Sequence, residues 1–250
     1  MGEVFAIVSG KGGTGKTTAA ANVGAALSAA GMKTLLMDLN FITDDLSVHL
    51  GIEKRIAYNL TDVLESNCRI IQALVTDSRL EGLYVLPASG TRELRVISKA
   101  SFVKLVSMLK QSFDCILIDT PTGFCPGTDY ALAAADSAVL VTTPDRISVR
   151  DTKKLLQHPD FSGVRKSLLI NRFSRQRYRN YDFPSPEDIA LDVGEALLGI
   201  IPEDDMIAAA AENGFVLTDF MNGVGKTFDN VAGRLLGEDI PINLKKIGLK

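Results

Sequence analysis

The sequence predicts an α/β protein with a mostly parallel sheet that is covered by helices on both faces. Short apolar segments bounded by turn residues recur along the 250-residue chain, and stretches with helical periodicity separate them. Parallel strands that are buried on both faces have such continuous apolar sequences. We expect strands at residues 4–8, 34–37, 83–86, 115–118, 138–142, 168–170 and 198–201.

The helices are predicted from their periodicity and from the residues at their ends. The clearest one follows the first strand, where residues 17–30 are rich in alanine and Gly31 favours a helix C-cap. Pro184 and Pro186 precede another helical stretch. We expect helices at residues 17–30, 102–110, 148–157, 187–197 and 226–236.

Length and composition limit the organisation and the partners. The chain is long enough for one large domain, which we assign to residues 1–241, and a short basic tail follows at residues 242–250. With 27 basic and 30 acidic side chains, the formal net charge of −3 argues against a broadly basic nucleic-acid binder. The three cysteines fit neither a disulfide framework nor a metal site, and the features of a signal peptide or a membrane span are missing from the sequence. We therefore expect a cytoplasmic protein.

Residues 10–17, GKGGTGKT, match the phosphate-binding pattern GxxxxGK[ST] in full. They lie directly after the first predicted strand and directly before the first predicted helix, which is the context that this pattern requires. Glycines let the backbone N–H groups turn toward phosphate oxygens, and the helix N-terminus adds a partial positive charge. We expect Lys16 to reach the β- and γ-phosphates and Thr17 to bind Mg²⁺. The expected nucleotide-binding residues of this loop are Gly10, Lys11, Gly12, Gly13, Thr14, Gly15, Lys16, Thr17 and Thr18.

A carboxylate for the metal is expected at the end of a neighbouring strand. Asp119 follows the apolar residues 115–118, which is the Walker-B arrangement, and the turn at residues 120–123 is suited to sensing the γ-phosphate. A second fragment at residues 223–227, GVGKT, fails the full pattern because Phe220 stands where glycine is required. We interpret that fragment as a loop before the last helix.

Lys11 narrows the class of protein. The sequence SGKGGTGKTT at residues 9–18 resembles the deviant Walker-A motif of the MinD/ParA family of P-loop ATPases. Similar blocks follow in the order and spacing of the MinD branch: LPAS at 86–89, DTPTG at 119–123, TTPD at 142–145, SVRD at 148–151 and LGIIPED at 198–204. The resemblance covers roughly residues 3–241 and implies a P-loop NTPase fold of the SIMIBI type.

The resemblance also implies a function. It indicates an ATPase that binds ATP or ADP with Mg²⁺, forms an ATP-dependent homodimer, and switches the binding of a regulatory protein or a membrane in cell-division site placement or a related positioning process. Lys11 of each protomer would reach the phosphates of its partner. The metal would lie near Thr17, Asp38 and Asp119, and the sequence does not identify the regulatory protein.

The adenine-binding residues are likewise implied by the resemblance. They are Asn171, after the predicted strand at residues 168–170, and the backbone around Pro202, Glu203 and Asp204. An amide is suited to a purine edge because it both donates and accepts hydrogen bonds. From the residues alone, an asparagine that merely turns the chain after a strand is an equal alternative.

Asn40 is a departure from the family. Its members usually carry Asp-x-Asp after the second strand, whereas this chain has Asp38-Leu39-Asn40. An amide can orient water but cannot accept its proton. We assign the catalytic roles to Lys11, Lys16 and Asn40, and we expect hydrolysis to be slower by a factor of roughly 10². Two alternatives stay open: Asp44 or Asp45 takes over the role, or the chain is a non-hydrolysing ATP-binding scaffold.

Two further segments bear on partners. The tail at residues 242–250 has three lysines and no acid, which attracts anionic lipid, but its apolar residues do not share one helical face. It is therefore either an ordinary tail or a weak peripheral contact with the inner face of the cell membrane. Arginines at 172, 175, 177 and 179, in an expected basic surface loop at residues 171–186, leave open a ParA-like, DNA-associated partition ATPase, although the acidic balance argues against nucleic acid. His49 and His158 are isolated in sequence, and we expect surface or packing roles for them.

Overall fold

An eight-stranded sheet forms the centre of the protein in the computed structural model, which describes residues 1–41, 44–88, 98–181, 184–217 and 223–243. The strand order is β3-β4-β2-β5-β1-β6-β7-β8, and every pair of neighbours is parallel except β3 and β4. The strands are β1 Glu3–Val8, β2 Thr34–Asp38, β3 Val75–Thr76, β4 Leu83–Leu86, β5 Cys115–Asp119, β6 Ser137–Thr142, β7 Arg165–Phe173 and β8 Leu197–Pro202. The predicted fold class and all seven predicted strands are confirmed.

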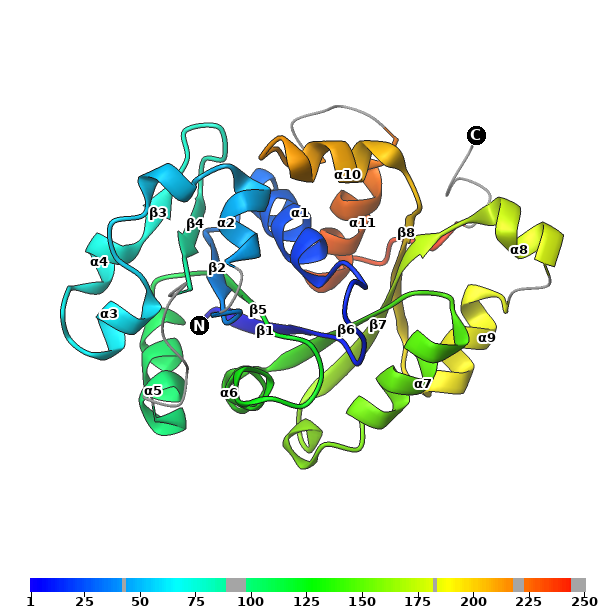
Figure 1. The fold of residues 1–250 in the computed structure, drawn as a ribbon, viewed down its shortest axis with the longest axis horizontal. Coiled ribbons are helices and arrows are strands. Elements are labelled where there is room, and N and C mark those ends of the chain that lie inside the picture. The colour runs from blue at the N-terminus through cyan, green and yellow to red at the C-terminus, as the bar shows by residue number, and fades with distance from the viewer. Residues whose placement is uncertain (42–43, 89–97, 182–183, 218–222, 244–250) are drawn as a thin grey trace.

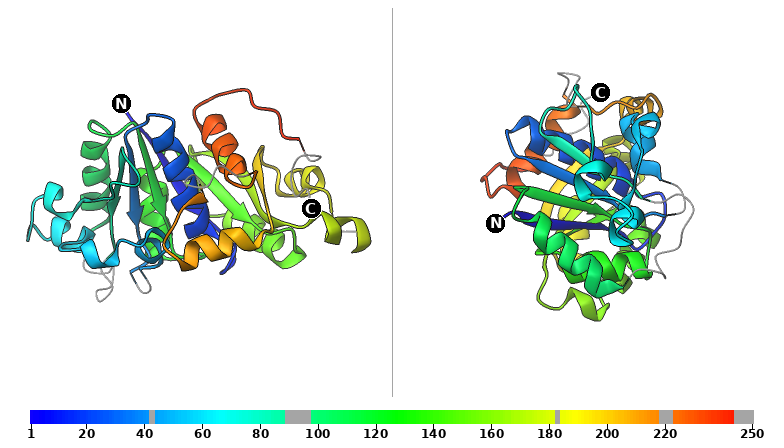
Figure 2. Two further views of the ribbon diagram at one scale, coloured as in Figure 1. Left: turned by 90° about the horizontal axis from the view of Figure 1, so that it is seen from above. Right: turned by 90° about the vertical axis from the view of Figure 1, so that its left-hand side faces the viewer.

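Helices cover both faces of the sheet. They are α1 Lys16–Ala29, α2 Asp45–Leu50, α3 Leu60–Leu64, α4 Ile70–Ala73, α5 Lys99–Leu109, α6 Pro126–Ala134, α7 Arg146–Leu155, α8 Arg175–Tyr181, α9 Pro186–Val193, α10 Asp205–Glu212 and α11 Gly225–Leu235, with single 3₁₀ turns η1 Glu53–Arg55 and η3 Pro159–Phe161. One layer contains α1, α2, α10 and α11, and the other contains α5, α6, α7 and α9 (Figures 1 and 2). Each layer packs on its own buried apolar cluster, one on either side of the strands.

The helix α1 shows how the chain packs against the centre of the sheet. It is buried along most of its length, including alanines on several sides, because it is enclosed by the sheet, α2 and α11. Gly24 stands in its middle although glycine is a poor helix former. A Cβ on Gly24 would come within 2.6 Å of Leu36 Cδ2, so the glycine allows a close approach of α1 to β2.

Several predicted boundaries change in the structure. The basic segment that we predicted to be a loop contains α8, whose first turn is capped by Ser174, since its Oγ accepts from the Arg177 N–H at 3.4 Å. The helix predicted to end at residue 197 ends at Val193, because Gly194 takes φ +82°. The strand β3 was not predicted, since its two residues are too short to show a period.

The carboxyl ends of β1, β2 and β5 meet at one edge of the sheet, where the turn between β1 and α1 also lies. Among the helices that the structure describes, none is both long and apolar enough to cross a bilayer. In the fragment at residues 223–227, α11 begins at Gly225, so the interpretation as a loop before the last helix holds for residues 223–224, and residues 225–227 form the first turn of that helix.

Candidate nucleotide-binding site

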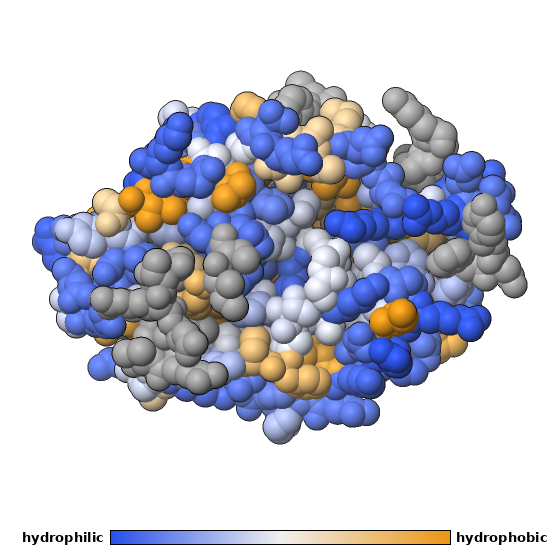
Figure 3. Space-filling model, in the orientation of Figure 1, coloured by the Kyte–Doolittle hydropathy of each residue, from blue (hydrophilic) through white to orange (hydrophobic). Residues whose placement is uncertain are grey.

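The loop at residues 10–17 occupies the position in the sheet where α/β proteins bind ligands. It follows β1, and the chain continues from β1 to β2 on one side and reaches β6 on the other, so the strand order reverses here. On the face shown in Figure 3, a pale, weakly polar strip lies near the centre, where Figure 1 has the turn from β1 to α1. Gly12 and Gly13 are exposed. A ligand can therefore reach this part of the loop from solvent.

Glycine is required at several points of this loop. Gly13 and Gly15 take φ of +75° and +86°, in the left-handed region that favours glycine. A Cβ on Gly15 would also come within 2.2 Å of Asn171 Nδ2. A Cβ on Gly10 would come within 2.2 Å of the Asp151 carbonyl oxygen, so the start of the loop lies directly against the backbone of α7.

Lys16 is held inside the loop by two hydroxyl groups. Its Nζ donates to Ser9 Oγ and to Thr122 Oγ1, each at 2.9 Å. Burial lowers the pKa of Lys16, although the nearby Asp119 opposes this. Thr122 belongs to the turn after β5 that we predicted to sense the γ-phosphate. The structure thus places that turn in contact with the loop lysine.

Two carboxylates lie side by side next to the loop. Asp38 and Asp119 are paired residues on β2 and β5, and Thr17 Oγ1 donates to Asp119 Oδ2 at 2.6 Å. The Asn40 N–H donates to Asp38 Oδ1 at 2.6 Å. Burial raises the pKa of Asp119 to about 6, and burial together with the charge of Asp119 raises the pKa of Asp38 well above its usual range. Burying these two carboxylates side by side is costly while both are charged, and a cation bound between them would reduce that cost.

The unpaired oxygens of these residues fit a magnesium ion. Within the described part of the chain, Asp38 Oδ2, Asp119 Oδ1 and Thr14 Oγ1 are buried without a hydrogen-bond partner. A buried oxygen with no partner is costly, and carboxylate and hydroxyl oxygens are the ligands that Mg²⁺ prefers. The three residues predicted for the metal, Thr17, Asp38 and Asp119, are thus brought together with two carboxylate oxygens still available.

Lys11 contacts its own chain. Its Nζ donates to Asp145 Oδ1 at 3.1 Å, and both side chains are 39% exposed. Asp145 also accepts from Thr143 Oγ1 at 2.6 Å and from the Ser148 N–H at 3.0 Å, where it caps α7. Burial alone would raise the pKa of Asp145, but the hydrogen bonds from Thr143, Ser148 and Lys11 lower it. Asp145 was not predicted as a site residue, although the TTPD block contains it.

A cavity of about 410 Å³ opens beside the loop. Its lining residues are Lys11, Gly12, Gly13, Thr143, Pro144, Asp145, Arg172, Phe173, Ser174, Arg177, Tyr178 and Glu203. The rings of Phe173 and Tyr178 lie 6.0 Å apart by their centroids. Arg177 pairs with Glu203 at 3.5 Å. Sequence reasoning missed these two aromatic residues, which lie at the end of β7 and in α8.

The residues predicted for adenine lie on or directly after two neighbouring strands, β7 and β8. Asn171 is buried on β7, where its Nδ2 donates to the Thr14 carbonyl at 2.7 Å and its Oδ1 accepts from the Arg172 N–H at 2.9 Å. One Nδ2 hydrogen and one Oδ1 lone pair remain for another partner. Pro202 ends β8, Glu203 lines the cavity, and Asp204 caps α10 by accepting from the Met206 N–H at 2.9 Å.

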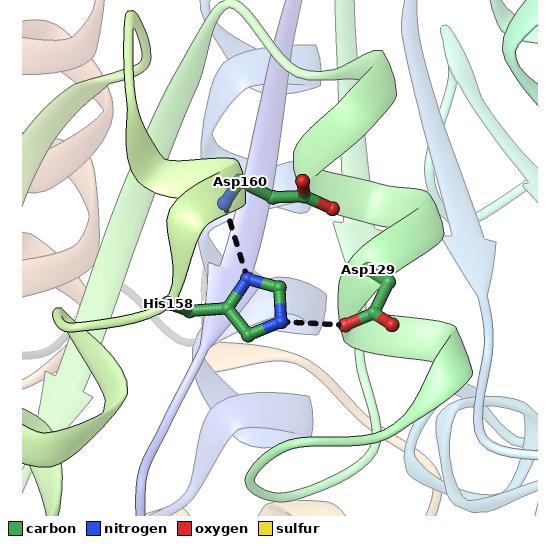
Figure 4. Close-up of side chains that lie close together, drawn as sticks. All are labelled: Asp129, His158 and Asp160. Carbon is green, nitrogen blue, oxygen red and sulfur yellow. Dashed lines mark hydrogen bonds and ion pairs between the residues drawn. The ribbon is translucent and has the colours of Figure 1, made fainter.

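Both histidines link neighbouring elements of the fold, which is consistent with the packing roles expected for them. His49 contacts Thr18 at the start of α1, as described below. His158 Nε2 lies 3.1 Å from Asp129 Oδ1, and its Nδ1 accepts from the Asp160 N–H at 3.2 Å (Figure 4). Because Nδ1 is an acceptor, Nε2 carries the hydrogen and cannot bind a metal without losing it. This cluster therefore links α6 to η3 rather than forming a metal site.

The arginines of α8 do not form one basic face. Arg175 and Arg179 are one helical turn apart, whereas Arg177 lies on the other side and pairs with Glu203. A continuous cationic surface is what phosphate contacts to DNA require. The structure therefore gives no support to the DNA-binding alternative. Residues 244–250 of the basic tail lie outside the described residues.

Known proteins are similar to this chain in fold and in sequence. A family model described as an AAA domain matches residues 2–168. The septum site-determining protein MinD of Synechocystis is 39% identical over 246 residues, which are 96% of this chain and 92% of that protein. The MinC:MinD cell division protein complex of Aquifex aeolicus has a TM-score of 0.89 at 34% identity, covering 96% of this chain and 98% of that one. MinD of Pyrococcus horikoshii complexed with Mg-ADP has a TM-score of 0.84 at 28% identity, covering 96% and 100%. The chain belongs to the MinD family of septum site-determining P-loop proteins.

Proposed function

We propose that this chain binds ATP or ADP with Mg²⁺, forms an ATP-dependent homodimer and hydrolyses ATP slowly, and so switches a partner in cell-division site placement. The observation that carries this proposal is the group formed by Thr17, Asp38 and Asp119 beside Lys16. It combines a loop hydroxyl, two buried carboxylates with unpartnered oxygens and a buried ammonium. A structural relative complexed with Mg-ADP supports the same assignment.

The residues of the site have distinct roles in this proposal. Lys16 would exchange Ser9 and Thr122 for phosphate oxygens, and the loop N–H groups from Gly10 to Thr18 would donate to the same phosphates. Thr17, Asp38 and Asp119 would hold Mg²⁺, which neutralises phosphate charge when bound. The adenine would lie between Asn171 and the backbone of Pro202, Glu203 and Asp204.

Dimer formation would require Lys11 to leave Asp145. The pair is partly exposed, and such ion pairs contribute at most about 1 kcal/mol, so the release costs little. We expect Lys11→Ala to bind ATP and stay monomeric in analytical ultracentrifugation with ATP and Mg²⁺. As a matched control, Asp145→Asn removes the same ion pair and keeps the lysine, and it should dimerise with ATP. Normal dimerisation of Lys11→Ala would contradict the proposed role.

Slow hydrolysis would follow from Asn40. Its N–H is bound to Asp38, so position 40 lies next to the carboxylate pair, and a carboxylate there would accept a proton that an amide cannot. We expect Asn40→Asp to speed single-turnover hydrolysis by a factor of roughly 10². Equal rates in the two proteins would show that Asn40 does not slow hydrolysis. Complete absence of turnover in both proteins would favour the non-hydrolysing scaffold.

The proposed change between the ATP-bound and ADP-bound states would also control binding to a regulatory protein and to a membrane. The structural relative in a MinC:MinD complex supports a regulatory protein partner, and we propose a cytoplasmic location with peripheral contact to the inner face of the membrane. Sedimentation with anionic vesicles tests the contact. We expect more protein to pellet with ATP than with ADP, and equal amounts would exclude an ATP-dependent contact.

A further inference from the structure

His49 joins the short helix α2 to the start of α1. Its Nδ1 lies 2.8 Å from the Asp45 carbonyl oxygen, and its Nε2 lies 3.2 Å from Thr18 Oγ1. A carbonyl only accepts hydrogen bonds, so Nδ1 carries the hydrogen and donates it. In the neutral ring Nε2 is then an acceptor, and the Thr18 hydroxyl must be the donor. Both side chains are half-buried beside the loop.

The Thr18 hydroxyl has only one hydrogen to donate. Thr18 directly follows Thr17 in the first turn of α1, the part of a helix whose N–H groups bind phosphate. While the hydroxyl donates its hydrogen bond to His49 Nε2, it cannot donate to a phosphate oxygen. A phosphate that accepts this hydrogen leaves Nε2 of His49 without its donor.

We propose that His49 is a positioning residue that competes with the nucleotide phosphates for the Thr18 hydroxyl, so that nucleotide binding breaks this hydrogen bond between α2 and α1. The inference rests on the proposed nucleotide binding at the loop. Through the contact of His49 with Thr18, α2 would respond directly to whether a nucleotide is bound. His49 touches none of the atoms predicted to hold Mg²⁺, so this connection is separate from the carboxylate pair.

The other contacts of α2 show which parts of the molecule a movement of this helix would affect. At its N-terminal end, the Leu46 N–H is close enough to Asp38 to oppose the rise in the pKa of that carboxyl. At its C-terminal end, the Leu50 carbonyl accepts from Arg79 Nη2 at 2.7 Å, and Arg79 Nη1 donates to the Gly214 carbonyl at 3.0 Å. The helix therefore connects the site to the turn after α10. Loss of the bond to Thr18 would leave the bond to Arg79 and the buried packing of Leu46 and Leu50 in place.

Calorimetry with Mg-ADP at pH 8.5 tests the competition, since free imidazole is neutral there. We expect His49→Ala to bind Mg-ADP about threefold to tenfold more tightly than the wild type, the factor that one net hydrogen bond represents. His49→Gln keeps an acceptor and should stay closer to the wild type. His158→Ala, which removes the other histidine of the chain, should not change the affinity. Unchanged or weaker binding by His49→Ala would overturn the inference.

A second substitution separates competition from a general effect on α2. Thr18→Val removes the hydroxyl, so adding His49→Ala to it should have no further effect on affinity, whereas Thr18→Ser should preserve the effect. If His49→Ala tightens binding equally in the Thr18→Val protein, the competition is refuted. Failure of the wild type to bind Mg-ADP would remove the proposed function and this inference together. Normal binding without the histidine effect would remove the inference alone.

Imidazole ¹⁵N NMR gives a readout that a merely structural role would not produce. In the wild type, Mg-ADP should shift the unprotonated nitrogen of His49 to the position of a nitrogen with no hydrogen-bond donor. In Thr18→Val that nitrogen should have the shifted position before nucleotide is added. The signals of His158 serve as the internal reference. A His49 signal that Mg-ADP leaves unmoved would also overturn the inference.

Discussion

The loop at residues 9–18 and the residues that follow β2 form two halves of one site, and they are constructed differently. The loop is shaped by its backbone, through the positive φ of Gly13 and Gly15 and the contact with Asn171. The residues after β2 are held by side chains: Asp38 accepts from the Asn40 N–H, and Asp44 takes φ +46° without being a glycine. The residues predicted to bind phosphate thus form one contiguous motif, whereas the conformation after β2 depends on individual side-chain hydrogen bonds.

The largest effect is expected when the backbone of the loop is disturbed. Gly15→Ala would force an alanine to φ +86° and bring its Cβ within 2.2 Å of Asn171 Nδ2. We expect the affinity for Mg-ADP to fall by roughly 100-fold, measured by calorimetry.

Gly31→Ala is the matched control for this substitution. Gly31 has a similar φ of +88°, but its Cβ would meet no atom within 4 Å. That variant should lose about 1 kcal/mol of stability and keep its affinity. If Gly15→Ala binds Mg-ADP as well as Gly31→Ala does, the contact with Asn171 is not what shapes the loop.

A smaller effect is expected from the carboxylate pair, and it depends on pH. The folded-state pKa of Asp119, about 6, lies above its ordinary value of 3.8. The folded protein therefore holds this proton more tightly, and the free energy of unfolding falls as pH rises from about 4 to about 6. Asp119→Asn should be about 2 kcal/mol more stable than the wild type at pH 7.5 without nucleotide, and should lose this advantage below pH 4.

Urea unfolding at the two pH values measures this difference, and Mg-ADP binding should be lost in the same variant. An Asp119→Asn protein that is less stable than the wild type at pH 7.5 would show that the buried carboxylate does not destabilise the protein in the absence of nucleotide. The neutral amide can still accept from Thr17, so the loop itself should remain folded.

The smallest effect is expected at the start of α2. Burial raises the pKa of Asp44, and its carboxylate accepts from Ser47 Oγ at 2.8 Å. Asp44→Asn keeps an acceptor, tolerates positive φ and removes a partly buried charge, so it should stabilise the protein by about 0.5 kcal/mol at pH 7. Asp45→Asn removes an acid from the first turn of the same helix and should destabilise by a similar amount. Urea midpoints that move in the same direction for both variants would contradict this.

The strands were predictable because each is a buried apolar run between turn residues. The helices α2, α3, α4, α6 and α10 were not predicted, since their four to nine residues give too little periodicity. For α8, the prolines and arginines of the segment suggested a loop, but the helix ends before Pro184 and Pro186. Local sequence patterns therefore predicted the strands of the sheet better than the short helices around it.

In the site, the residues of the motifs were predicted, but two of their contacts with residues outside the predicted site were not. Lys16, Thr17 and Asp119 belong to patterns that specify their position, and the structure brings them together. The contacts of Lys11 with Asp145 and of Thr18 with His49 join residues 134 and 31 positions apart in sequence. No local pattern encodes such pairs, since they depend on how β6 and α2 pack against the loop.

The contact between Gly10 and the backbone of α7 has a consequence for how the sequence can vary. Since Asp151 meets the loop through its carbonyl group, the side chains on the surface of α7 take no part in that contact. Arg150 and Lys153 can therefore change among relatives, and with them the surface that α7 offers, while the loop keeps its shape. Gly10 has no such freedom, because any side chain there would push the helix away.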